Sequence, residues 1–270
     1  MAILNVLILG YGKMGSAIFK GLKESMGVQV KISVVVRSPA TVLDLKKELQ
    51  SEVTTDFQTP LKTADLVIVC VKPQQAGPVF KALSRSLNAK QTVISICAGI
   101  SLAKLREFVG NKASLIRAMP NTPCLISEGV TLLCADGPAS NAALELSQKV
   151  FKSLGEVVVI EENLFDAATS ISGCGPAYVF MMIEALSDAG VKVGLPRELA
   201  TRLAAKTFQG SSQMLIERKE HPAKLKDEVT TPGGITIEAL MALEEGKLRI
   251  ALMKAVVAAT EKSRVMGERA

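Results

Sequence analysis

Residues 3–15 read Ile-Leu-Asn-Val-Leu-Ile-Leu-Gly-Tyr-Gly-Lys-Met-Gly, and this stretch decides the fold. Ile3–Leu9 is an apolar run typical of a buried strand, and G-x-G-x-x-G follows it and opens a helical pattern. This order of strand, glycine loop and helix is what a dinucleotide-binding site requires; the alternative is a chance glycine loop. The first glycine makes the tight turn, the second admits the pyrophosphate, and the third lets helix and strand pack closely. We expect phosphates at the helix N-terminus, and cofactor contacts from Gly10, Tyr11, Gly12, Lys13, Met14 and Gly15.

Short apolar runs alternate with amphipathic stretches as far as Glu162, and only helical patterns follow. Runs of this length separated by helices predict a mostly parallel sheet covered on both faces. We therefore expect a Rossmann-type α/β domain over residues 1–162 and an all-helical domain over residues 163–270. The predicted strands are Ile3–Leu9, Val30–Val36, Leu66–Val71, Thr92–Ile96, Ser114–Ala118, Val130–Cys134 and Val157–Ile160. The predicted helices of the first domain are Met14–Ser25, Thr41–Leu49, Gln75–Leu87, Leu102–Phe108 and Ala139–Leu154.

The composition is that of a globular protein. Its 270 residues are 48% hydrophobic and 21% charged, and no apolar run approaches the length of about 18 to 20 residues that a membrane-spanning helix needs. The net charge of +6 is scattered, and with two Tyr and no Trp the chain offers no stacking platform for nucleic acid. A mild positive field suits small anionic ligands. The five cysteines show no metal-type spacing, so we expect reduced thiols, no metal and a cytoplasmic location.

One predicted helix has no polar face. Ala177–Leu186 is apolar nearly all round, and such a helix must be buried on every side. The mean hydropathy of +0.30 is high for a soluble monomer and also indicates apolar surface buried between subunits. We expect a partner subunit to cover this helix. The alternative is a helix sandwiched between the two domains.

The ends of the predicted strands indicate the cofactor. An NAD site places a carboxylate after the second strand, whereas this chain has Arg37 and Ser38 there and no carboxylate until Asp44. Arg37 can pair with a 2′-phosphate and Ser38 can donate to it, so NADPH is favoured and NADH is the weaker alternative. A solvated strand-end arginine is the other interpretation. Val71 and Lys72 end the next strand at the predicted crevice. Asn121 could hold the nicotinamide carboxamide, although an ordinary turn explains it almost as well.

A second glycine turn lies in the helical half. Residues 230–241 read Thr-Thr-Pro-Gly-Gly-Ile-Thr-Ile-Glu-Ala-Leu-Met. Two adjacent glycines let the backbone approach a ligand, and the N–H groups of such a turn with the hydroxyls of Thr231 and Thr236 would suit a small carboxylate. The alternative is a helix–helix loop in which Thr236 is the N-cap of the next helix, a role compatible with substrate binding.

The reaction class follows from what is missing. Alcohol oxidation needs a base, and the only histidine, His221, lies in a charged segment typical of the surface. The β-hydroxyacid dehydrogenases share the two-domain layout and carry a catalytic lysine at the position where this chain has Val179. A protonated imine accepts hydride without a base, so we expect an imine substrate. The proton can come from a threonine hydroxyl, an ordered water or a substrate already protonated in solution, and Thr236 is the candidate side chain.

The whole chain resembles the pyrroline-5-carboxylate reductases. The resemblance rests on the glycine loop, residues 71–74 (Val-Lys-Pro-Gln), 117–123 (Arg-Ala-Met-Pro-Asn-Thr-Pro), 172–178 (Ser-Gly-Cys-Gly-Pro-Ala-Tyr) and, most specifically, 225–237. It implies NADPH-dependent reduction of 1-pyrroline-5-carboxylate to L-proline, the last step of proline biosynthesis. It implies that the substrate carboxylate binds to Thr231, Gly233, Gly234 and Thr236. It also extends the cofactor site to Lys72, Pro73 and Ala98.

The resemblance further implies an intertwined homodimer in which the substrate turn completes the neighbour's active site, and a possible decamer built from dimers. The chain departs from the family pattern at Cys174, where Ser is usual, and at Thr230-Thr231, where Ser or Cys-Ser is commoner. Both departures keep small size. The alternatives are a reductase of another small imino or oxo acid, and a non-catalytic NADP-sensing protein.

Overall fold

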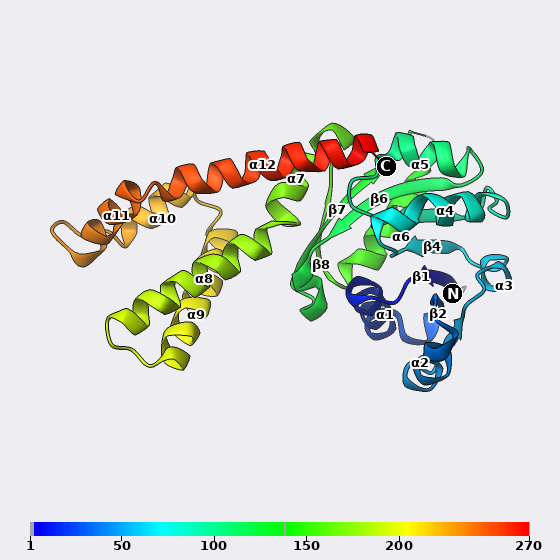
Figure 1. Ribbon diagram of the computed structural model, residues 1–270, viewed down its shortest axis with the longest axis horizontal. Coiled ribbons are helices and arrows are strands. Elements are labelled where there is room, and N and C mark those ends of the chain that lie inside the picture. Colours follow the sequence, from blue (N-terminus) through cyan, green and yellow to red (C-terminus); the bar gives the residue numbers. More distant parts are fainter. Residues whose placement is uncertain (1–2, 138, 270) are drawn as a thin grey trace. The chain divides into compact units, whose positions relative to one another are not determined.

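The structure is a computed structural model that describes residues 3–137 and 139–269. The chain forms two compact units: one runs to Cys174 and resumes at Ala259, and the other is Gly175–Ala258 (Figure 1). The change from strands to helices falls earlier than this division, because the first helix after the sheet still packs against the sheet. The domain limits at residues 162 and 163 therefore describe the change in secondary structure, and the packing divides the chain at residue 174.

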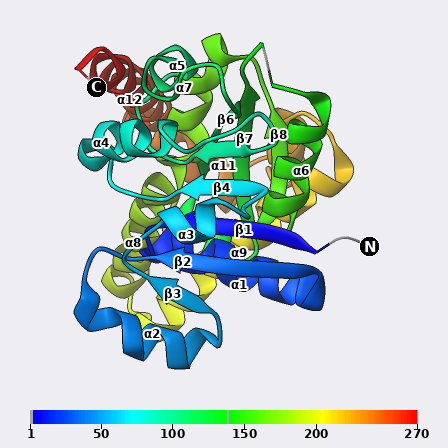
Figure 2. The same cartoon turned by 90° about the vertical axis from the view of Figure 1, so that its right-hand side faces the viewer.

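The first unit contains a single sheet of eight strands. Its order is β3-β2-β1-β4-β5-β6-β7-β8, and Figure 2 shows β3, β2, β1 and β4 following one another from the bottom of the view. All pairs are parallel except β6 with β7, so the expected mostly parallel sheet is confirmed. The strands are β1 (Leu4–Leu9), β2 (Val30–Val35), β3 (Glu52–Thr54), β4 (Leu66–Val69), β5 (Thr92–Ser95), β6 (Ser114–Pro120), β7 (Gly129–Ala135) and β8 (Gly155–Val159).

Helices cover both faces of this sheet. Phe80, Leu105 and Phe165 belong to the core on one face, and Ile18 and Phe151 to the core on the other. All five side chains are buried at 1% exposure or less, so each face is sealed by its own helical layer. The helices and turns are α1 (Lys13–Met26), η1 (Gly27–Gln29), η2 (Pro39–Thr41), α2 (Val42–Leu49), α3 (Gln58–Leu61), α4 (Pro73–Ser84), α5 (Leu102–Val109), η3 (Thr122–Ile126), α6 (Asn141–Lys152) and α7 (Glu162–Ser172).

The sheet has one topological switch point. From β1 the chain moves outward to β2 and β3, then returns to the other side of β1 with β4. In parallel sheets a crevice opens at the carboxyl ends of the strands where the order reverses, and this is where ligands bind. The residues after β1, β2 and β4 therefore meet at one edge.

The second unit is helical. It comprises α8 (Gly175–Lys192), α9 (Arg197–Arg218), α10 (Pro222–Glu228), α11 (Ile235–Glu245) and the first half of α12 (Leu248–Arg269). Helices α8 and α9 pack on each other through small residues, because the hydroxyls of Ser187 and Thr201 lie 2.6 Å apart and a Cβ on Gly190 would lie 2.8 Å from that of Ala200.

This helical unit has almost no core of its own. Within residues 175–258 only Ser187, Ala200 and Ala204 are buried. Phe180 is 62% exposed and Met181 is 71% exposed. Both lie on α8, the helix that we expect a partner subunit to bury. Other large apolar side chains exposed on the unit include Leu186, Val193, Leu203, Ile216, Ile235, Met241, Leu243, Ile250, Met253 and Val257. Apolar surface on this scale marks an interface with another protein surface.

Two further features bear on the expectations from composition. Among the described residues, no helix is long and apolar enough to span a membrane. All five cysteines are free thiols.

The exposed face of α8 generates a prediction. Phe180→Glu places a charge on the apolar face, and we expect it to shift the protein to a smaller species, because a charge desolvated in an apolar interface is costly. Light scattering coupled to size-exclusion chromatography measures the mass. Val28→Glu is the matched control, since Val28 is 92% exposed and belongs to the other unit. An unchanged mass for Phe180→Glu would show that this face is not an interface.

Candidate active site

A cavity of about 1080 Å3 lies at the switch point of the sheet. It is bordered by the segments that follow β1, β2 and β4, which the glycine loop and the strand ends predict as a nucleotide site. Seven predicted cofactor residues line it: Gly10, Tyr11, Gly12, Arg37, Ser38, Val71 and Lys72.

The glycine loop has the geometry that the pattern predicts. Gly10 adopts a φ of +101°, and a Cβ there would lie 2.8 Å from the carbonyl oxygen of Cys70. A Cβ on Gly15 would lie 2.2 Å from the carbonyl oxygen of Gly10, so helix α1 packs directly on the turn. By contrast, a Cβ on Gly12 would meet nothing within 4 Å. The packing of the protein itself therefore requires glycine at positions 10 and 15, whereas Gly12 leaves room for a ligand.

The start of α1 is open to an anion. Gly12 is its N-cap, no side chain caps the helix, and its first turn holds no acidic residue. The first N–H groups of the helix and its dipole therefore face the cavity without a competing protein carboxylate. This arrangement fits the pyrophosphate of a dinucleotide.

Arg37 provides a positive charge at the second strand end. Its side chain is exposed on the cavity wall, and within the described residues it makes no ion pair or hydrogen bond. The hydroxyl of Ser38 likewise has no partner there. Asp44 lies on the same wall without pairing with Arg37. A guanidinium and a hydroxyl whose hydrogen-bond donors have no partner among the described residues fit a phosphate monoester.

The hydroxyl of Tyr11 is buried beside this site and has no hydrogen-bond partner among the described residues. Its ring packs edge-on against Phe19 at a centroid distance of 5.9 Å. Burial raises the pKa of Tyr11, and the carboxylate of Glu48 raises it further. Tyr11 therefore stays neutral and presents an unsatisfied donor close to the nucleotide cavity.

Two thiols lie at the inner end of the crevice. Burial raises the pKa of Cys70 far above that of a free thiol, and it raises the pKa of Cys97 to about 11. The Cys97 thiol donates to the carbonyl oxygen of Val71 at 3.4 Å. Both groups therefore remain protonated and act as small apolar side chains rather than as nucleophiles.

Six predicted cofactor residues do not line the cavity: Lys13, Met14, Gly15, Pro73, Ala98 and Asn121. Asn121 has a different role from the one expected. Its amide oxygen accepts from the N–H of Val130 at 2.9 Å, and its amide nitrogen donates to the carbonyl oxygen of Ser172 at 3.0 Å. The side chain is 9% exposed and links β6, β7 and α7, so its amide already has a structural role, and a contact with the carboxamide stays a prediction.

Sequence reasoning missed several residues on the cavity wall. Thr55 and Phe57 follow β3, a strand of three residues whose pattern is too short to predict. Gln74, Gln75, Pro78 and Val79 come from the first turns of α4. Only Pro73, at the start of that helix, gives a sequence signal for where it begins.

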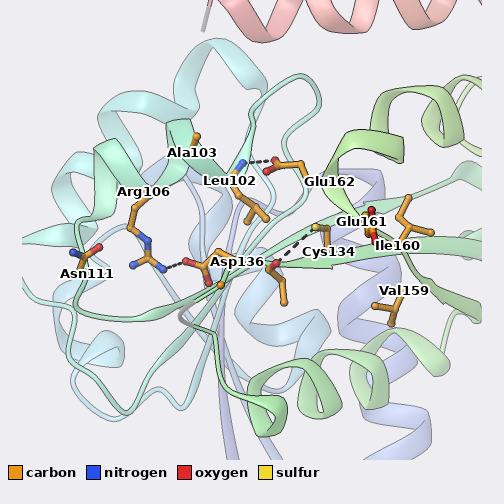
Figure 3. A pocket seen from close by; sticks show the side chains of 12 residues that line it. Leu102, Ala103, Arg106, Asn111, Cys134, Asp136, Val159, Ile160, Glu161 and Glu162 are labelled. Carbon is orange, nitrogen blue, oxygen red and sulfur yellow. Dashed lines mark hydrogen bonds and ion pairs between the residues drawn. The ribbon is translucent and has the colours of Figure 1, made fainter.

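A second, shallower cavity of about 700 Å3 lies between α5, β7 and the start of α7 (Figure 3). Its main cation is already used, because Arg106 pairs with Asp136 and donates to the carbonyl oxygens of Gly110 and Ala113. Burial lowers the pKa of Arg106. Glu162 on the same wall accepts from the N–H of Leu102 at 2.6 Å. These contacts hold α5 against the sheet.

The second glycine turn lies in the helical unit. Gly233 has a φ of +67°, and the N–H of Gly234 donates to the carbonyl oxygen of Thr231 at 3.0 Å. The prediction that Thr236 is the N-cap is wrong. Gly234 is the N-cap and α11 begins at Ile235, because the tight turn back to Thr231 places the extended residue there.

With Gly234 as the N-cap, the turn is more suitable for an anion. No side chain caps α11, so the N–H groups of its first turn have no side-chain partner, and Thr236 lies within that turn. In the described chain neither the Thr231 nor the Thr236 hydroxyl makes a hydrogen bond. Thr230 instead donates to the carbonyl oxygen of Lys226 at 2.7 Å and closes α10.

The other positions considered for a catalytic base do not supply one. His221 is exposed, and its Nδ1 accepts from the N–H of Ala223 at 3.2 Å, which caps α10. Val179 lies on the exposed face of α8. In the two described ranges, no group of three His, Cys, Asp or Glu side chains is placed to bind a metal.

Comparison with known proteins places this arrangement in a family. Residues 162–266 match the family model for pyrroline-5-carboxylate reductase dimerisation, and residues 5–99 match that for NADP oxidoreductase, coenzyme F420-dependent. A pyrroline-5-carboxylate reductase of Arabidopsis thaliana is 38% identical over 266 residues, which is 98% of this chain and 96% of that protein. That of Escherichia coli is 38% identical over 94% of this chain and 95% of its own length.

The chain belongs to the pyrroline-5-carboxylate reductase family. A crystal structure of the Plasmodium falciparum pyrroline carboxylate reductase with NADP bound superposes with a TM-score of 0.88. It is 36% identical and covers 99% of both chains. The chain is therefore an oxidoreductase with an NADP-binding Rossmann domain that uses NAD(P)H, and its helical region is an oligomerisation region.

The glycine loop generates a prediction with an internal control. Gly12→Ala should fold with an unchanged melting temperature but bind NADPH at least about tenfold more weakly, because its Cβ enters the space that the pyrophosphate needs. Gly15→Ala should lower the melting temperature, because its Cβ meets the carbonyl oxygen of Gly10. Calorimetry and NADPH titration distinguish the two. Equal effects of both variants on stability would contradict the division of roles.

Proposed function

We propose that this protein reduces 1-pyrroline-5-carboxylate to L-proline with NADPH, the last step of proline biosynthesis. The observation that carries the proposal is the uncapped start of α11, where the turn of residues 231–236 offers free N–H groups and two unpaired threonine hydroxyls. In a member of this family, a cofactor cavity accompanied by an open carboxylate turn favours an enzyme over a sensor. A protein that only senses NADP has no need of a carboxylate site.

Each part of the cofactor site has a distinct task. NADPH supplies the hydride. Gly12 and the start of α1 hold the pyrophosphate, while Arg37 and Ser38 bind the 2′-phosphate. Val71, Lys72 and Pro73 form the next strand end, and Ala98 lies beyond them toward the nicotinamide. Lys13, Met14 and Gly15 support the first turn of α1.

The substrate site binds and orients the imino acid. Thr231, Gly233, Gly234 and Thr236 hold its carboxylate through backbone N–H groups and hydroxyls. The protonated imine is electrophilic without a base, so holding it in line with the hydride donor and excluding water provides most of the rate enhancement. Thr236 is the candidate for direct contact with the reacting part of the substrate.

The assembly proposed is a homodimer, with a decamer built from such dimers as its higher form. Support comes from the apolar faces of α8, α11 and α12, and from the match of residues 162–266 to a dimerisation family model. In this assembly the substrate turn of one subunit completes the active site of its neighbour. We also propose a cytoplasmic location, which five free thiols favour.

One assay tests the reaction. NADPH oxidation is followed with 1-pyrroline-5-carboxylate and, in parallel, with a panel of other cyclic imines and oxo acids. The proposal predicts the highest kcat/KM for 1-pyrroline-5-carboxylate. A higher value for another imino or oxo acid would identify a related reductase, and no turnover of any substrate alongside tight NADPH binding would identify a sensor. Either result would overturn the proposed reaction.

Removing the guanidinium should change the cofactor preference. Arg37→Ala is expected to weaken NADPH binding by about 10- to 100-fold and NADH binding much less, because only NADPH has the 2′-phosphate that Arg37 pairs with. Arg37→Lys keeps the charge and should lie between. Dissociation constants for both nucleotides provide the test. Equal weakening of both would exclude the 2′-phosphate role.

Removing one hydroxyl should affect the substrate alone. We expect Thr236→Val to raise the KM for the imine by about tenfold while the KM for NADPH stays unchanged, because a hydrogen bond to a charged carboxylate is lost. Thr236→Ser retains the hydroxyl and serves as the control. Steady-state kinetics with each substrate varied in turn measures both constants. If Thr236→Val left the imine KM unchanged, the carboxylate site would have to lie elsewhere.

A further inference from the structure

Arg117 is a buried cation that the proposed reaction does not use directly. It lies on β6 with 6% exposure, and its guanidinium stacks over the ring of Phe165 at 4.1 Å. Nη1 lies 3.3 Å from Oε1 of Glu162, and Nη2 lies 3.2 Å from Oδ1 of Asp166. Both carboxylates belong to α7, one turn apart. A single buried charge thus fixes the first turns of α7 on the sheet.

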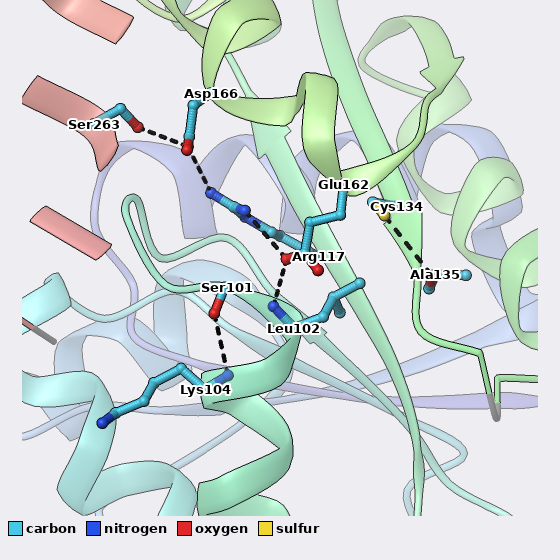
Figure 4. A network of polar contacts seen from close by, with 9 residues as sticks. All are labelled: Ser101, Leu102, Lys104, Arg117, Cys134, Ala135, Glu162, Asp166 and Ser263. Carbon is cyan, nitrogen blue, oxygen red and sulfur yellow. Dashed lines mark hydrogen bonds and ion pairs between the residues drawn. The ribbon is translucent and has the colours of Figure 1, made fainter. Parts of the chain in front are cut away.

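The two carboxylates extend this network to other elements (Figure 4). Oε1 of Glu162 also accepts from the N–H of Leu102, the first residue of α5, at 2.6 Å. Oδ1 of Asp166 also accepts from the hydroxyl of Ser263, on the last turns of α12, at 2.9 Å. Arg117 therefore connects β6, the start of α5, α7 and the end of α12 through two shared oxygens.

Between these attachment points lies the loop of residues 96–101. It ends at Ser101, and the N–H of the next residue, Leu102, donates to Glu162. Its middle is Gly99, with a φ of +73°, where an added Cβ would lie 3.1 Å from the Cβ of Met266 on α12. Conversely, a Cβ on Gly267 would lie 3.1 Å from the carbonyl oxygen of Gly99. The end of α12 thus packs directly on the loop, and the Arg117 network fixes both the helix and the loop.

This loop leaves the sheet at the edge where the cofactor binds. It follows β5, the parallel neighbour of β4, and the residues after β4 line the nucleotide cavity. The loop carries Ala98, which does not line the nucleotide cavity and which the cofactor site proposed above places toward the nicotinamide. Its position relative to β4 therefore controls where that end of the dinucleotide can lie.

We propose that Arg117 is a positioning residue for hydride transfer: through Glu162 and Asp166 it fixes the loop of residues 96–101 between α5 and α12, and so sets the position of the nicotinamide. It touches neither cofactor nor substrate. This inference rests on the proposed cofactor-dependent reaction. Removal of one partner of an ion pair is strongly destabilising where the remaining charge stays buried. Here the carboxylates are about a quarter to a third exposed, so water can solvate them once the cation is gone.

The test separates the two ends of the cofactor. Arg117→Met should lower kcat by about 10- to 100-fold and increase the primary isotope effect with NADPH deuterated at nicotinamide C4. The Kd of adenosine 2′,5′-bisphosphate, which probes only the far end of the cavity, should not change. Ser263→Ala removes only the link from Asp166 to α12 and should lower kcat to a smaller extent with the same pattern. Because it is a mild substitution, it decides the matter if Arg117→Met does not fold.

Arg106→Met is the matched control. Arg106 is also an ion-paired arginine of this unit, but it holds the C-terminal end of α5 through Gly110 and Ala113. Its replacement should lower the melting temperature and leave kcat unchanged. An unchanged kcat in both Arg117→Met and Ser263→Ala would overturn the proposal. So would a loss of affinity for adenosine 2′,5′-bisphosphate in parallel with kcat, since that pattern marks general damage to the fold.

A readout without turnover keeps this inference distinct from the proposed reaction. The fluorescence of bound NADPH reports the surroundings of the nicotinamide. Arg117→Met should reduce the emission of the bound cofactor toward that of free NADPH while the adenosine end stays bound. If the wild-type protein turned over no imine, the reaction would fail but this measurement would still test the positioning role. Emission identical to wild type in Arg117→Met would contradict it.

Discussion

The helices of residues 175–258 cannot bury their own apolar faces, and the rest of the architecture depends on this constraint. Only three of their side chains are buried, and all three belong to the small residues Ser187, Ala200 and Ala204. Helices α8 and α9 pack on each other through small residues and enclose no core. Phe180 and Met181 must therefore be buried against another protein surface, and this burial supplies the hydrophobic free energy. The same unit carries the turn of residues 231–236. Association and the proposed substrate site therefore share one structural element.

The nucleotide unit follows the opposite principle. Its two cores are complete, and its binding groups are left unsatisfied: an exposed guanidinium at Arg37, an uncapped helix at Gly12 and an unpartnered hydroxyl at Tyr11. By contrast, Arg106 and Arg117, whose side chains are largely buried, are ion-paired within the fold. Arg117 does not line the nucleotide cavity, and the role proposed for it acts through other residues.

The sequence predicts those parts of the site that depend on local pattern. The glycine loop, the strand ends at Arg37 and Lys72, and the second glycine turn all lie where a one-dimensional signal exists. The wall formed by Thr55 and Phe57 follows a strand of three residues, too short to show a period. The structural role of Asn121 cannot be predicted from local pattern, because its hydrogen-bond partners, Val130 and Ser172, are remote in sequence. The N-cap of α11 shifts to Gly234 because the turn closes on Thr231, which propensity does not encode.

Direct hydride transfer from NADPH to a cyclic imine is the central claim. It is tested most directly by incubating the protein with 1-pyrroline-5-carboxylate and NADPH deuterated at both positions of nicotinamide C4, followed by mass spectrometry of the product. Direct transfer predicts L-proline that carries one deuterium, on the ring carbon next to nitrogen that does not bear the carboxylate. Proline without deuterium, or no proline while NADPH binds tightly, would contradict it.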